Sequence, residues 1–120
     1  EFSRQAAEAG LGDRVVFTGY YPDLPGALRA MDIFALPTVL DEGFPTVSLE
    51  AQAMGLPVVA TRRGGTFETM REGETGLLVR AGDSRALAAA LDDLIGHRDR
   101  REAMGAAARA WVRPRFTLEA

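Results

Sequence analysis

Glu42 and Glu50 are the residues of this chain whose types and spacing best suit binding chemistry. A carboxylate accepts hydrogen bonds at both oxygens, so it suits two adjacent hydroxyl groups such as those of a ribose. Between the two glutamates, Pro45 marks the expected start of a helix, whose unpaired N–H groups and positive dipole end suit an anion. The segment therefore predicts a pocket for a diol and an anion at the mouth of one helix.

The loop between Glu42 and the helix determines which groups could line this pocket. Gly43 permits tight or left-handed backbone geometry, and Pro45 fits the first helical position because its φ is fixed and no N–H is needed there. Pro45 itself cannot donate a hydrogen bond. The amides that remain to bind an anion are those of Phe44, Thr46 and Val47.

Glu50 has a defined place on the expected helix. It lies about five residues from the helix start, so a rise of 1.5 Å per residue puts it roughly 7 to 8 Å from the mouth. Helical spacing places it on one edge with Thr46 and Ala53. The residues expected to face the core are Val47, Ala51 and Met54. One ligand could contact both glutamates, although this spacing is also compatible with two solvated residues near a helix end.

The elements that must position this segment alternate between two kinds of pattern. Short aliphatic or β-branched runs, expected to be strands, cover residues 14–18, 32–36, 57–61 and 77–79. Helices are expected to end near Met31, to cover residues 45–54, and to form a short turn through Glu68. This alternation predicts an α/β fold, a Rossmann-like open parallel sheet with helices on both faces, in which ligands bind beyond the carboxyl ends of the strands.

The last third of the chain is expected to be helical. A helix that begins at Ser84, with Asp83 or Ser84 as its N-cap, carries on one face Leu87, Leu91, Leu94 and Ile95. A final helix, which Pro114 ends, repeats this spacing with Met104, Ala108, Trp111 and Val112. The single histidine, His97, falls between the two helices, and we expect a role at a helix end.

Composition excludes several functional classes. A chain of 120 residues, 47% hydrophobic and 26% charged, is the size of one globular domain, and no apolar run approaches the roughly 20 residues that span a bilayer. Its net charge of −3 argues against nucleic acid as a partner, because that affinity requires clustered positive charge. The absence of cysteine excludes thiolate zinc sites and fits a reducing compartment, so we expect a cytoplasmic protein. All 14 basic residues are arginine, which excludes a Schiff-base lysine and a P-loop lysine.

The segment around the two glutamates resembles the GT-B glycosyltransferases of the retaining group 1 class, family GT4. That family carries two glutamates separated by seven residues, as in residues 42–50 here, and the similarity continues through residues 51–60. Further blocks follow the family pattern in the same order at residues 16–19, 31–37, 64–68, 73–79 and 83–95. The joint occurrence of these blocks is far more specific than the two glutamates, and it implies the C-terminal lobe of a GT-B fold.

The resemblance implies a role for each matching site residue. Glu42 would approach the donor sugar as the catalytic carboxylate, and Glu50 would bind the ribose diol. The loop lining the sugar and phosphate would consist of Gly43, Phe44, Pro45 and Thr46. The donor would be a nucleotide-diphosphate sugar, transferred to an unidentified acceptor with retained anomeric configuration, without a bound metal or other cofactor.

The resemblance also implies that part of the site lies outside this chain. Residues 1–10 have the pattern of a helix already under way, so we expect residues 1–120 to be a single-domain fragment of the donor-binding lobe. The N-terminal acceptor lobe and the basic residues that neutralise the leaving diphosphate would precede it, and we expect the isolated chain to be inactive. Two alternatives stay open: a non-catalytic nucleotide-sugar-binding or structural module, and a GT-B nucleotide-sugar epimerase.

Three further segments each allow two interpretations. Residues 62–65 could add a phosphate contact or form a simple turn with surface arginines. Tyr20 and Tyr21 could wall a base pocket or pack as ordinary aromatics. The arginine-rich residues 98–115, interleaved with acidic residues, could attach the parent protein to anionic lipid or form a solvated helix face.

Overall fold

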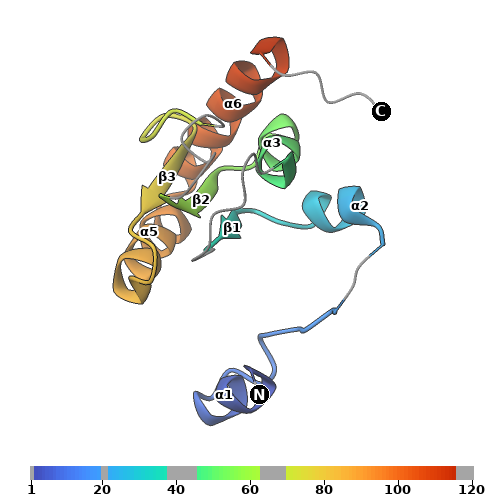
Figure 1. Ribbon diagram of the computed structural model, residues 1–120, viewed down its shortest axis with the longest axis vertical. Helices are drawn as coiled ribbons and strands as arrows, with labels where there is room; N and C mark the ends of the chain where they lie inside the picture. The colour runs from blue at the N-terminus through green and yellow to red at the C-terminus, as the bar shows by residue number, and fades with distance from the viewer. Residues whose placement is uncertain (1, 20–21, 38–45, 63–69, 116–120) are drawn as a thin grey trace.

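The computed structural model describes residues 2–19, 22–37, 46–62 and 70–115, and its centre is a parallel sheet (Figure 1). The described strands lie in the order β1 (Phe34–Leu36), β2 (Val58–Thr61) and β3 (Gly76–Val79). Val58 lies opposite Phe34 on one side and opposite Gly76 on the other. Parallel pairing of strands that are separated by helices confirms the predicted α/β fold.

The helices agree with the sequence pattern to within a few residues. Their bounds are α1 (Phe2–Glu8), α2 (Leu24–Arg29), α3 (Thr46–Ala53), α5 (Ser84–Gly96) and α6 (Arg98–Arg115). The predicted end of the last helix at Pro114 is off by one residue, because Pro114 lies inside the last turn of α6. Asp83 is the N-cap of α5, since its Oδ1 accepts a hydrogen bond of 2.9 Å from the Ala86 N–H. The predicted turn through Glu68 lies outside the described residues.

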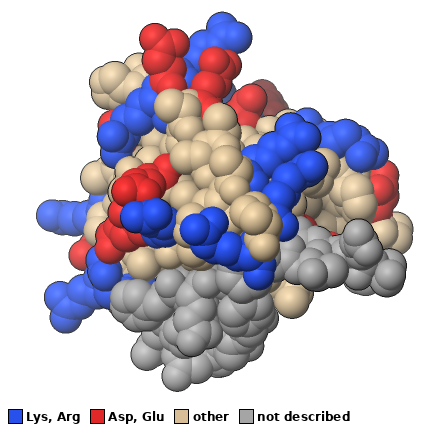
Figure 2. Space-filling model, turned by 90° about the horizontal axis from the view of Figure 1, so that it is seen from above, with Lys and Arg blue, Asp and Glu red and all other residues tan. Residues whose placement is uncertain are grey.

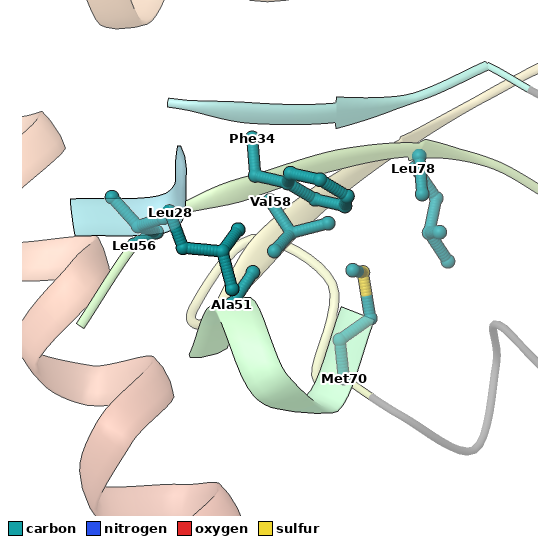
Figure 3. Packing of buried hydrophobic residues seen from close by; sticks show 8 residues of the cluster. Leu28, Phe34, Ala51, Leu56, Val58, Met70 and Leu78 are labelled. Carbon is teal, nitrogen blue, oxygen red and sulfur yellow. The ribbon is translucent and has the colours of Figure 1, made fainter. Parts of the chain in front are cut away.

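Helices cover both faces of the sheet, as predicted. Every residue of β2 is buried, and its side chains alternate between two apolar clusters. Val58 and Ala60 belong to the cluster that includes Leu28 of α2 and Ala51 of α3 (Figure 3). Val59 belongs to the opposite cluster, whose helical members include Leu94 of α5 and Met104 of α6.

Residues 14–18 form no strand, which corrects the first strand prediction. Val16 is 82% exposed and Phe17 is 52% exposed. A strand requires a hydrogen-bonded neighbour, and no described strand pairs with this segment. In Figure 1, α1 and the chain that follows it lie apart from the sheet and its covering helices.

Two apolar residues predicted to face the core are exposed. Met54 lies beyond the end of α3, in the turn before Gly55, and is 37% exposed. Leu56 takes the core position instead. Ile95 is 63% exposed because the buried face of α5 also includes Ala86 and Ala90, which shifts the centre of that face away from it.

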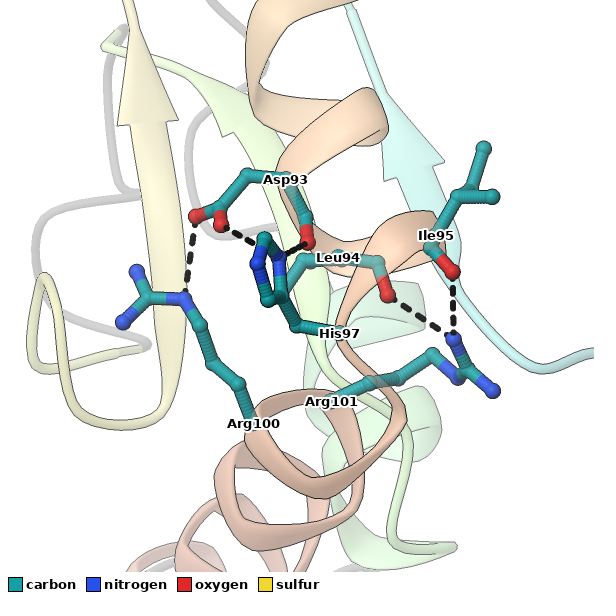
Figure 4. A network of polar contacts seen from close by, with 6 residues as sticks. All are labelled: Asp93, Leu94, Ile95, His97, Arg100 and Arg101. Carbon is teal, nitrogen blue, oxygen red and sulfur yellow. Dashed lines mark hydrogen bonds and ion pairs between the residues drawn. The ribbon is translucent and has the colours of Figure 1, made fainter.

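The corner between α5 and α6 is fixed by polar contacts (Figure 4). Asp93 lies between two nitrogen-bearing side chains: its Oδ1 is 3.3 Å from His97 Nδ1 and its Oδ2 is 2.9 Å from Arg100 Nε. Arg101 donates hydrogen bonds of 2.8 and 3.2 Å to the carbonyls of Leu94 and Ile95, which have lost helical partners at the end of α5. The predicted helix-end role of His97 is confirmed.

Candidate functional site

The start of α3 lies at the carboxyl edge of the sheet. The strand β1 ends at Leu36, α3 begins at Thr46, and β2 runs parallel to β1, so α3 must run back along the sheet. Its first turn therefore lies beyond the carboxyl ends of the strands, where open α/β sheets bind ligands. The predicted loop residues Glu42, Gly43, Phe44 and Pro45 lie outside the described residues.

Thr46 and Glu50 are the predicted site residues that the structure describes. Thr46 is exposed in the first turn, and Glu50 is half-buried one turn later, roughly 6 Å along the axis. Val47 and Ala51 pack with the apolar cluster under α3, as predicted. The predicted separation between a polar edge and a core face holds only in part, because Met54 is exposed and the polar Ser48 and Gln52 are buried.

The sequence analysis missed a buried polar pair on α3. Ser48 and Gln52 are both fully buried, and Gln52 Nε2 lies 3.2 Å from Ser48 Oγ and 3.3 Å from the Ser48 carbonyl oxygen. Their spacing of four residues was the available signal, but polar residues at that spacing are usually solvated. These hydrogen bonds lie within α3, where they give the buried Gln52 amide group acceptors on the preceding turn.

A small cavity opens at the same edge of the sheet. Its volume is about 180 Å³. It is lined at the strand ends by Pro37, Thr61 and Val79, and at the start of α5 by Ser84 and Leu87. Larger cavities of about 450 and 590 Å³ lie around Met54 and Gly55, at the opposite end of α3. Because parallel sheets bind ligands beyond their carboxyl ends, the smaller cavity is the better candidate for part of a binding site.

Arg62, at the end of β2, is engaged in an ion pair. Its Nη2 lies 3.0 Å from Glu72 Oε2, and both side chains are a little under half exposed. A phosphate at this position would have to compete with the Glu72 carboxylate. The neighbouring residues 63–65, as well as Tyr20 and Tyr21, lie outside the described residues, so their predicted roles remain predictions.

The arginines of α6 are interleaved with acidic side chains. Arg98 Nε lies 3.0 Å from Glu102 Oε2, and this hydrogen bond and charge, together with the charge of Asp32, raise the pKa of Arg98. On the face shown in Figure 2, acidic residues lie among the basic ones. Within the described ranges, no helix is both long and apolar enough to cross a membrane, and no three histidine or acidic residues are grouped to hold a metal.

Known proteins match this chain along most of its length. The family described as glycosyl transferases group 1 matches residues 1–97. A GDP-mannose-dependent α-(1-6)-phosphatidylinositol monomannoside mannosyltransferase of Mycolicibacterium smegmatis is 42% identical over 117 residues, which is 91% of this chain and 31% of that protein.

Two solved structures show the same fold. The crystal structure of Anabaena Alr3699/HepE in complex with UDP has a TM-score of 0.91 and 32% identity, over 96% of this chain and 32% of that one. The C-terminal domain of a group 1 glycosyl transferase, LpcC from Francisella tularensis, has a TM-score of 0.89 and 28% identity, over 98% of this chain and 61% of that one. The chain spans about a third of the length of the curated relatives it matches.

Proposed function

The chain belongs to the group 1 glycosyl transferases, and from this membership we propose that it forms the donor-binding part of a retaining GT-B glycosyltransferase. The donor is a nucleotide-diphosphate sugar, and the acceptor lobe belongs to a longer protein. The observation that carries the proposal is the placement of α3, whose first turn and Glu50 lie at the ligand-binding edge of a fold similar to that of a UDP complex.

Glu50 is proposed to bind the ribose. Its side chain lies one turn from the open end of α3, so a ribose beside this helix would carry its diphosphate toward the free N–H groups of the first turn. Two hydroxyls would donate to the two carboxylate oxygens. This arrangement uses a negative side chain where the ligand has hydroxyls and a positive helix end where the ligand has phosphate.

Glu42 and the loop of Gly43, Phe44, Pro45 and Thr46 are proposed to hold the sugar. In the transfer, the bond between the anomeric carbon and the diphosphate oxygen breaks with its electron pair going to the diphosphate. The acceptor hydroxyl oxygen bonds to the same face of the anomeric carbon, and its proton passes to the departing diphosphate oxygen. We propose that no metal takes part, so positive charge from the helix end and from residues of the longer protein would stabilise the leaving diphosphate.

The nucleobase is best found by experiment, because the relatives differ. The mycobacterial relative is named for GDP-mannose, whereas Alr3699/HepE was solved with UDP and with UDP-glucose. Calorimetry on the complete protein with UDP, GDP and their sugar conjugates would identify the donor. Failure to bind any of them would contradict the proposal and favour a non-catalytic module.

Substitution of Glu50 tests its role directly. Loss of two hydrogen bonds to a charged group should weaken donor binding by about tenfold or more in Glu50→Ala. The matched control is Glu8→Ala, which removes an exposed glutamate of α1, and it should leave binding unchanged. Equal affinities for the two variants would exclude Glu50 from the site. We also expect the isolated chain to transfer no sugar, and turnover of a labelled nucleotide sugar by it would contradict this.

A further inference from the structure

Gly105 stands in the interior of α6, where glycine is an unfavourable helix residue. It is buried, and it lies against the turn that joins α3 to β2. A Cβ atom at this position would overlap the carbonyl oxygen of Gly55, and it would lie 3.0 Å from the carbonyl carbon of the same residue. It would also lie 3.3 Å from Pro57 Cδ. Only glycine at position 105 lets α6 approach this turn so closely.

The turn at Gly55 is connected by hydrogen bonds to the backbone of the candidate ribose-binding residue. Gly55 has a φ of 84°, a left-handed conformation that ends α3. The Met54 N–H donates to the Glu50 carbonyl at 3.2 Å, and the Leu56 N–H donates to the Ala51 carbonyl at 3.1 Å. A displacement of this turn would therefore move the last turn of α3, which begins at Glu50.

The helix α6 is not free to retreat from the turn. Its start is fixed by the contacts of Arg100 and Arg101 with the end of α5 (Figure 4). Further along, Met104, Ala108 and Val112 are buried. An added methyl group at position 105 would accordingly press on the backbone of Gly55, which cannot rotate away as a flexible side chain could.

We propose that Gly105 is a positioning residue for the donor: the close approach it permits between α6 and the Gly55 turn sets where α3 presents Glu50 to the ribose. This proposal rests on the proposed function, because it requires Glu50 to bind a ribose. Position 105 itself lies at the opposite end of α3 from the expected ligand, so its effect is transmitted through the helix.

The test compares two ligands in the complete protein. Calorimetry gives the Kd of the tighter-binding of UDP and GDP and the Kd of its 2′,3′-dideoxy analogue, which retains base and diphosphate but lacks the diol. The Kd of the dideoxy analogue divided by the Kd of the natural nucleotide measures ribose recognition separately from overall binding. In Gly105→Ala the ratio should fall about tenfold, the expected effect of losing hydrogen bonds to a carboxylate, while binding of the dideoxy analogue changes little.

The matched control is Gly96→Ala at the end of α5, because a Cβ there would meet nothing within 4 Å. It should keep the ratio of the unsubstituted protein. If Gly105→Ala does not fold, Gly55→Ala displaces the same turn from the other side, because alanine is strained at the φ of 84° that glycine adopts freely there. It should lower the ratio in the same way.

Three outcomes are informative. A folded Gly105→Ala or Gly55→Ala with an unchanged ratio would overturn the positioning role, even if its thermal stability is reduced. A ratio near one in the unsubstituted protein would instead contradict ribose recognition by this lobe. The positioning role would then be contradicted as well, because it requires a bound ribose. A ratio that falls in Gly105→Ala but not in Gly96→Ala supports the proposal.

Discussion

Two segments with nearly the same sequence have opposite structures in this chain. Residues 15–18 read Val-Val-Phe-Thr, and β2 reads Val-Val-Ala-Thr. The first segment is exposed, with Val16 82% exposed and no pairing to a described strand, whereas β2 is buried throughout between two parallel neighbours. The difference teaches that β-branched residues provide only a preference for strands, and that neighbours on both edges and helices on both faces decide the outcome.

Hydrogen exchange should show the largest contrast between the two segments. The amides of β2 bond within the centre of the sheet, so they should exchange only when the whole domain unfolds, with protection corresponding to about 5 kcal/mol or more. Those of residues 15–18 should exchange with little protection. Equal protection of both segments would contradict this difference and would mean that residues 15–18 pair with a strand in solution.

Introduction of a charge at equivalent positions should give the next largest effect. Val59→Asp would bury an unpaired carboxylate at a fully buried position and should lower the free energy of unfolding by about 3 kcal/mol or more. Val16→Asp should change it by less than about 0.5 kcal/mol, because the side chain is already in water. Urea unfolding followed by circular dichroism measures both, and similar losses would show that residue 16 is buried in solution.

Removal of a helix cap should give the smallest of the three effects. It extends the comparison between the packed domain and the exposed N-terminal segment from strand residues to a helix end. Asp83→Ala loses the hydrogen bond to the Ala86 N–H that begins α5, so it should lower the free energy of unfolding by about 1 kcal/mol. Asp13→Ala, in the exposed N-terminal segment, is the matched control and should have no measurable effect. Equal midpoints of urea unfolding for the two variants would mean that the cap does not stabilise the domain.

Much of the helical and sheet pattern was predictable because several local signals agreed. Gly55 ends α3 with a left-handed φ, Asp83 caps α5, and the aliphatic run at residues 57–61 indicated the strand that the structure shows as β2. The exposure of Met54 and Ile95 was not predictable from periodicity alone. The direction in which each helix faces the sheet depends on where its ends are anchored, and a difference of one turn moves an apolar residue into solvent.

For the candidate site, the sequence located α3 and the edge on which Glu50 lies, and its resemblance to group 1 glycosyltransferases assigned the expected roles. The roles of Glu42, Gly43, Phe44, Pro45, Thr46 and Glu50 stay predictions. The buried Ser48 and Gln52 pair and the cavity at the strand ends became visible only in the structure, since both depend on what packs over α3 and β3.

The sequence by itself determined the fold class, the family and the start and end of the helix that carries Glu50, because caps, turns and periodicity are local properties of the chain. Only the tertiary structure decided which of two Val-Val segments became a strand, since pairing joins residues far apart in the sequence. It also showed that Gly105, outside every recognised motif, lies against the Gly55 turn. A glycine that permits a close approach has no side chain from which its contact could be predicted. Its role therefore depends on which part of the folded chain lies beside it.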